Sequence, residues 1–149
     1  MYDTILLSTD GDVASEDAKS HAVALAAAHG ATLHALYVVD EDVVTAYSGD
    51  EYVDEAEGPE HGLEEHGTDA LAAIRTAADD AGVEVVTEMR HGHPAETIVE
   101  YGEEADADLL ILGTRRRPEA YRTLLGGVTD RVLRLTSRPT TVVKTEVPA

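Results

Sequence analysis

Short apolar runs alternate along the chain with longer stretches in which apolar residues recur every three or four positions. A short apolar run is typical of a buried β-strand, and the longer period is typical of an amphipathic helix. Strands and helices therefore follow one another, which predicts βαβ units and a parallel sheet. Five strands are predicted, over residues 4–8, 32–39, 83–89, 109–112 and 140–144.

Helices are predicted between these strands, over residues 14–29, 63–81, from Pro94 onward, and 120–135. Gly30 is the expected stop of the first helix, because glycine readily adopts the left-handed conformation that ends helices. Pro94 suits the first position of a helix, where a missing N–H does no harm, and His93 is the expected cap before it. Gly126 and Gly127 would destabilise a helix interior by about 1–2 kcal/mol, so the last helix is expected to start near Gly127.

Residues 41–62 are acidic, contain glycine and show no clear apolar period. Without a period they offer no face that could be buried against the rest of the chain. We therefore expect a mobile excursion here.

Composition points to one ordinary globular domain. With 149 residues, 43% of them hydrophobic, the chain can bury a single core, and residues 1–149 are expected to form one domain. The absence of cysteine excludes disulfides and thiolate chemistry. No apolar run approaches membrane-spanning length, and no basic segment precedes an apolar one at the N-terminus, so a soluble cytoplasmic protein is expected.

The charge balance is strongly acidic, with 30 aspartates and glutamates against 11 lysines and arginines and a net charge of −19. Such a surface repels nucleic acid and anionic membranes, so neither is an expected partner. Scarce lysine and abundant acid resemble the composition of halophilic proteins, in which concentrated salt screens the self-repulsion. The acidity therefore indicates a saline habitat more than a function.

One short segment reverses this charge. Four of the eleven basic residues lie within eight positions, and they are Arg115, Arg116, Arg117 and Arg122. They follow an apolar run that ends at Gly113, and anion binding at the end of a buried strand is a common reason for such a cluster in α/β proteins. The alternative is pairing with the abundant surface carboxylates, which would contribute little stability.

The segment that begins at Gly113 resembles the C-terminal part of the universal stress protein family. In that family a Gly-x2-Gly-x9-Gly-[Ser/Thr] pattern surrounds a bound nucleoside triphosphate. Gly113 and Gly126 stand at the spacing of this pattern. Two positions depart from it, because Arg116 stands where the second glycine is expected and Gly127 stands where serine or threonine is expected.

The resemblance extends over most of the chain. Residues 2–11 are similar to the family's opening strand and Thr-Asp-Gly turn, and residues 36–40 are similar to the end of its second strand. The resemblance implies an α/β three-layer sandwich, with a five-stranded parallel sheet in the order 3-2-1-4-5 and helices on both faces. It also implies a homodimer that pairs through the last strand, residues 140–144.

In a sheet of that order, strands one and four are neighbours where the winding reverses, and ligands bind there, outside the carboxyl ends of the strands. The turns at residues 10–11 and 113–114 would then face each other across one crevice. The resemblance implies that Asp10 accepts hydrogen bonds from a ribose and that Val38, with Val39, flanks an adenine. The alternatives are that Asp10 caps the first helix or stabilises its turn, and that Val38 packs in the core. The predicted nucleotide-binding residues are Thr9, Asp10, Val38, Gly113, Thr114, Arg115, Arg116, Gly126, Gly127 and Val128.

Two functions fit this reading. The first is a stress-response regulator with a degenerate ATP crevice, where magnesium is present only together with a nucleotide. The alternative is a nucleotide switch that binds and hydrolyses ATP weakly. The sequence around the motif shows no nucleophile–base pair and no metal-binding carboxylates, so no catalytic residue is predicted and an enzyme is not expected. A phospho-receiver domain would need an aspartate where Met89-Arg90-His91 stands.

The seven histidines do not predict a metal site. His91 and His93 lie close in sequence, as do His61 and His66, but no cysteine joins them and no His-Glu-x-x-His spacing occurs. We therefore expect no specific metal ion.

Overall fold

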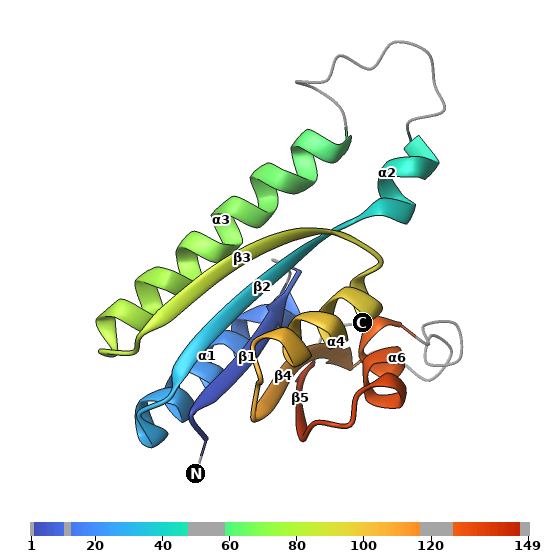
Figure 1. Cartoon of the computed structure of the whole chain (residues 1–149). Helices are drawn as coiled ribbons and strands as arrows, with labels where there is room; N and C mark the ends of the chain where they lie inside the picture. Colours follow the sequence, from blue (N-terminus) through green and yellow to red (C-terminus); the bar gives the residue numbers. More distant parts are fainter. Residues whose placement is uncertain (1, 11–12, 48–58, 117–126, 147–149) are drawn as a thin grey trace.

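The computed structural model describes residues 2–10, 13–47, 59–116 and 127–146. In that part of the chain, five strands form one parallel sheet in the order β3-β2-β1-β4-β5, which confirms the predicted order. Helices α1 and α3 cover one face, and α4 and α6 cover the other (Figure 1). The elements are β1 Thr4–Thr9, α1 Val13–His29, β2 Thr32–Asp40, α2 Glu41–Tyr47, α3 Pro59–Asp80, β3 Val85–Gly92, α4 Pro94–Glu104, β4 Leu109–Arg116, α6 Val128–Leu135 and β5 Thr140–Glu146.

The central strands are apolar because the sheet is covered on both faces. In β1, Ile5 and Leu7 are fully buried against the layer of α1 and α3, while Leu6 between them is buried against the layer of α4 and α6. In β4, Ile111 and Leu110 are buried on these two sides in the same way. Successive side chains of a strand point to opposite faces of the sheet. When both faces are buried, almost every residue of the strand is therefore apolar. The apolar runs at residues 4–8, 32–39 and 109–112 are therefore confirmed as buried strands, whereas β3 and most of β5, at the two ends of the sheet, are only partly buried.

One carboxylate aligns the two central strands. Asp108 Oδ2 accepts hydrogen bonds from the backbone N–H groups of Asp3 and Thr4, at 2.8 and 2.9 Å. The bond from Thr4, and then that from Asp3, lowers the pKa of Asp108 by stabilising its charged form. The ladder between β1 and β4 starts one residue later, where Ile5 lies beside Leu109. Both strands therefore run in register toward the same edge of the sheet.

The prediction for residues 41–62 is wrong at both ends of that segment. Helix α2 follows β2 without a break, and α3 begins at Pro59. Asp40 Oδ1 accepts the N–H of Asp42 at 2.9 Å, and acidic residues in the first turn suit the positive end of the helix dipole. With seven residues, α2 is too short to show a helical period in the sequence. Residues 48–58 lie outside the described part.

The first helix ends as predicted, and the third strand begins later than predicted. Gly30 follows α1 with a φ of 65°, in the left-handed region that favours glycine. β3 begins at Val85 rather than Val83. Val83 is buried in the preceding turn, where its N–H donates to the carbonyl oxygen of Ala78. Its burial gives it the apolar character of a strand residue, which explains the error.

Two helix starts agree with the sequence. α6 begins at Val128 with Gly127 as its N-cap, which confirms a start near Gly127. Residues 117–126, where the longer alternative would begin, lie outside the described part. His93 is the N-cap of α4, but its side chain makes no capping bond, and its Nδ1 lies 3.3 Å from Asp42 Oδ2.

None of the described helices is long and apolar enough to cross a membrane.

Candidate functional site

The carboxyl ends of β1 and β4 separate at one edge of the sheet. The ladder between these strands ends where Ser8 lies beside Leu112. β4 continues beyond Leu112 to Arg116, and its residues 113–116 pair with residues 143–146 of β5. In open α/β sheets, a ligand crevice forms where neighbouring strands part at their carboxyl ends.

This geometry corrects the prediction that strand four ends at Leu112. Gly113 and Thr114 lie within β4, as does the backbone of Arg115 and Arg116. Pairing with β5 uses backbone groups, which leave no apolar signature in the sequence. The predicted turn after Leu112 is therefore wrong, although Gly113 and Thr114 still lie at the edge where β1 ends.

Asp10, directly after β1, is bound to the start of α1. Its Oδ1 accepts a hydrogen bond from the Ser15 hydroxyl at 2.7 Å, and its backbone N–H donates to Ser15 Oγ at 3.2 Å. This contact with α1 agrees with the alternative in which Asp10 caps the first helix or stabilises the turn before it. Thr9 is buried, and Asp10 after it is exposed to solvent at the carboxyl edge of the sheet.

Helix α3 adds a contact that sequence reasoning missed. His66 Nε2 lies 2.9 Å from the carbonyl oxygen of Asp10, so this nitrogen carries the hydrogen and donates. Its ring packs edge-on against Tyr37, with 6.1 Å between the centroids. Burial, followed by the charge of Asp10, raises the pKa of Tyr37. No local signal distinguishes His66 from the other histidines, because its contact joins residues 56 positions apart.

Val38 and Val39 do not share a surface. Val39 is fully buried against the layer of α1 and α3, whereas Val38 is partly buried on the side of α4 and α6. Successive residues of a strand point to opposite faces of the sheet. The prediction that both valines flank one adenine is therefore wrong, and Val38 alone stays a candidate.

The N-terminal turn of α6 contacts β4. Thr129 Oγ1 donates to the carbonyl oxygen of Gly113 at 3.4 Å. Gly127 precedes the helix in an extended conformation, with φ −80° and ψ −163°, and Val128 after it is exposed. The first N–H groups of a helix have no intrahelical acceptor and attract anions. The contact of Thr129 thus brings this helix start beside Gly113.

Other parts of the predicted site are not tested by the structure. Gly126, Arg117 and Arg122 lie outside the described residues, and Arg115 and Arg116 are described by their backbone alone. The anion-binding role of the arginines therefore stays a prediction.

A separate cavity of about 220 Å³ lies between α1 and α3, beside the end of β1. Its lining includes Thr9, Ser15 and His66, and among the described residues it includes none of β4. It also includes Glu16, Lys19 and Asp69; Lys19 Nζ pairs with Glu16 Oε2 at 3.0 Å, so Asp69 leaves the lining with an excess of negative charge. Negative side chains around a cavity disfavour phosphate. This cavity is therefore a poor candidate for the phosphates of a nucleotide.

Comparison with known proteins identifies the family. A sequence profile described as the universal stress protein family matches residues 1–144. The chain belongs to this family. It is 37% identical over 147 residues to the universal stress protein MJ0531 of Methanocaldococcus jannaschii, and the alignment covers 97% of this chain and 83% of that protein.

Two solved universal stress proteins have a similar fold. One was solved in complex with cAMP; it has a TM-score of 0.67 and 24% identity, and the match covers 96% of this chain and 97% of that chain. The other, from Archaeoglobus fulgidus, was solved in complex with dAMP; it has a TM-score of 0.68 and 14% identity, and the match covers 96% of this chain and 98% of that chain. At these identities the likeness concerns the fold.

Proposed function

We propose that this universal stress protein is a cytoplasmic regulator of the stress response whose crevice between β1 and β4 binds an adenine nucleotide weakly. The observation that supports it is the hydrogen bond from Thr129 of α6 to the carbonyl oxygen of Gly113. This contact brings the first N–H groups of α6 beside the point where β1 and β4 separate. The family members solved with cAMP and dAMP support an adenine nucleotide as the ligand. In this proposal magnesium binds only together with the nucleotide.

Base, ribose and phosphates would contact different elements. Val38 packs against the adenine from the end of β2. Asp10 accepts hydrogen bonds from the ribose while it keeps its bond to Ser15, because a carboxylate offers about four acceptor sites. The phosphates lie between the end of β1, the end of β4 and the start of α6, at Thr9, Gly113, Thr114, Arg115, Arg116, Gly126, Gly127 and Val128.

The two departures from the family pattern are the reason to expect weak binding. Gly127 offers no hydroxyl to a phosphate, and Arg116 places a long side chain where a glycine would let the backbone come close. A missing hydrogen bond to a charged group weakens binding by roughly 1.5–3 kcal/mol, or about ten- to hundredfold. The arginines can restore part of this attraction by their charge, though less so in concentrated salt.

We therefore expect the double substitution Arg116→Gly/Gly127→Ser to tighten ATP binding about ten- to hundredfold over the wild type. Isothermal titration calorimetry with ATP and magnesium measures both affinities. Arg134→Ala is the matched control, because it removes one positive charge from an exposed position of α6. Its affinity for ATP should equal that of the wild type. Tight wild-type binding that the double substitution leaves unchanged would show that neither departure matters.

We also propose that the protein forms a homodimer through β5. This strand lies at one end of the sheet, where β4 pairs with one of its edges. Its Thr140–Glu146 sequence is rich in β-branched residues and suits addition of a further strand. Leu133 and Leu135 on α6, the helix that precedes β5 in the sequence, are 45% and 48% exposed, and a partner would cover such side chains.

Analytical ultracentrifugation in molar potassium chloride tests the dimer, because this salt screens the repulsion between two chains of charge −19. The expected result is a species of twice the monomer mass that dissociates on dilution. Only monomer from micromolar to millimolar protein would contradict the proposal.

A further inference from the structure

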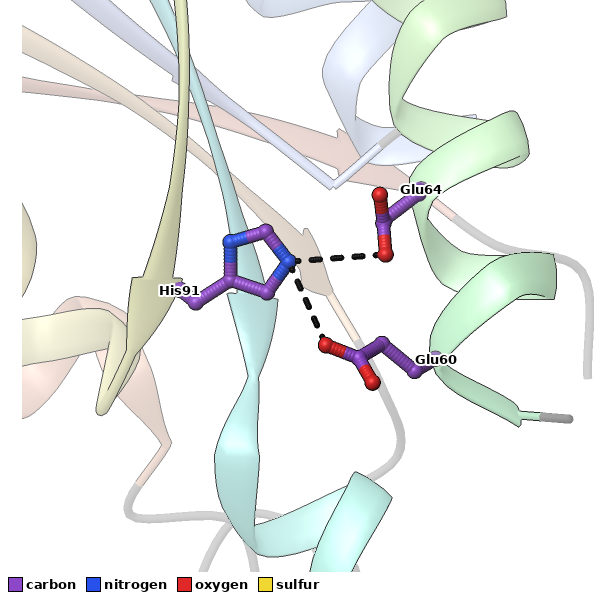
Figure 2. Close-up of side chains that lie close together, drawn as sticks. All are labelled: Glu60, Glu64 and His91. Carbon is purple, nitrogen blue, oxygen red and sulfur yellow. Dashed lines mark ion pairs between the residues drawn. The ribbon is translucent and has the colours of Figure 1, made fainter. Parts of the chain in front are cut away.

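Three potential metal ligands meet on the side of the sheet covered by α3. Figure 2 shows Glu60 and Glu64 of α3 pointing toward the ring of His91, which lies near the end of β3. His91 Nε2 lies 3.6 Å from Glu60 Oε1 and 3.6 Å from Glu64 Oε1. One ligand atom from each side chain falls within 4.8 Å of the others.

The fold explains why these residues meet. Glu60 and Glu64 are four positions apart, so they occupy one face of α3. α3 lies close to the sheet at Gly67, where an added Cβ would be 2.3 Å from the ring of Tyr37 on β2 and 2.8 Å from Cε of Met89 on β3. This close approach brings the first turns of α3 over the end of β3.

The distances fit a shared cation better than hydrogen bonds. A separation of 3.6 Å exceeds the usual N–H···O range, which ends at about 3.2 Å. Nitrogen and oxygen ligands lie about 2.0–2.2 Å from Zn²⁺, so two ligands of a tetrahedral site are about 3.4 Å apart. Both nitrogen–oxygen separations are therefore close to the spacing that one ion requires, and all three ligand atoms lie within 4.8 Å of one another.

We propose that Glu60, Glu64 and His91 bind a divalent transition-metal ion, with Zn²⁺ as the best match. An imidazole with two carboxylates suits zinc, whereas Mg²⁺ and Ca²⁺ prefer oxygen ligands alone. Three protein ligands leave a fourth position for water. The side chains are 40–56% exposed, so an ion can enter directly from solvent.

Charge supports the same assignment. Two carboxylates beside a protonated imidazole leave one negative charge, and beside a neutral imidazole they leave two. A divalent ion neutralises both glutamates, in a protein whose net charge of −19 already attracts cations. The sequence predicted no metal site because it offered only histidines close in sequence, while these ligands lie 27 to 31 positions apart across α3 and β3.

Calorimetric titration of Zn²⁺ into tag-free, chelator-treated protein in molar potassium chloride tests the site. We expect one saturable ion per chain, with binding weakened at least about tenfold in Glu64→Gln and in His91→Gln. Glu65→Gln is the matched control, because it removes the same charge from the next residue of α3. His93→Gln removes a second exposed histidine from the same part of the chain. Both controls should bind zinc as the wild type does.

Thermal unfolding with and without zinc tests whether the ion binds the folded protein. Zinc should raise the thermal midpoint of the wild type and of both controls, but not that of Glu64→Gln or His91→Gln, because only an ion bound to the native state stabilises it. An equal loss in Glu65→Gln and Glu64→Gln would show diffuse attraction to acidic side chains and would overturn the proposal. Absence of saturable binding, or equal competition by Mg²⁺, would overturn it as well.

Discussion

Replacing Ile111 with alanine is expected to lower the free energy of unfolding by about 2–5 kcal/mol. Ile111 is fully buried in β4, between Leu7 of β1 and Thr141 of β5, and it packs against the layer of α1 and α3. A strand held on both edges has little freedom to close the space left by the removed atoms, so a cavity remains. Urea denaturation followed by circular dichroism, with potassium chloride present to screen the net charge, measures the loss.

Val86→Ala provides the control. Val86 is also a β-branched strand residue, but it lies in β3 at the other end of the sheet and is 39% exposed. Its truncation should change the free energy of unfolding by no more than about 0.5 kcal/mol. If the two variants lost similar stability, the burial of β4 between two helical layers would be contradicted.

The second large effect is expected from a single methyl group on α3. Gly67→Ala should destabilise the protein by about 1–3 kcal/mol, because the new Cβ would lie 2.3 Å from the buried ring of Tyr37. Alanine is a better helix former than glycine by about 1 kcal/mol, which offsets part of the clash. The clash should outweigh this gain, since the ring of Tyr37 is buried in the core.

Gly62→Ala is the matched control, on the same helix. No atom lies within 4 Å of its added Cβ, so only the helix preference remains and the protein should become more stable by up to about 1 kcal/mol. Thermal or urea denaturation of the two variants should therefore shift in opposite directions. A stabilising Gly67→Ala would show that α3 lies farther from β2 and β3 than the structure places it.

Gly67 also connects stability to both proposed sites. The helix that it holds against the sheet carries His66, which donates to the carbonyl oxygen of Asp10, and also Glu64 of the proposed metal site. Displacement of α3 should therefore weaken zinc binding and disturb the turn after β1. This outcome separates a role of Gly67 in packing from a purely local effect on helix formation.

The amino-acid sequence by itself determined the order of strands and helices, since burial on both faces makes each central strand an apolar run. It also located helix boundaries wherever one residue has a marked backbone preference, as at Gly30 and Gly127. The segment from Gly113 onward identified the family, because its glycine spacing is a local pattern that needs no knowledge of contacts. The charge of −19 likewise follows from composition alone.

The tertiary structure alone decided which residues meet. It extended β4 to Arg116 through backbone pairing with β5, and it placed His66 on the carbonyl of Asp10. It also brought Glu60 and Glu64 to His91. Periodicity reports whether a position is buried, but not which distant position it faces. That choice depends on how closely α3 packs against the sheet and on how β5 pairs with β4, which are properties of the folded chain as a whole.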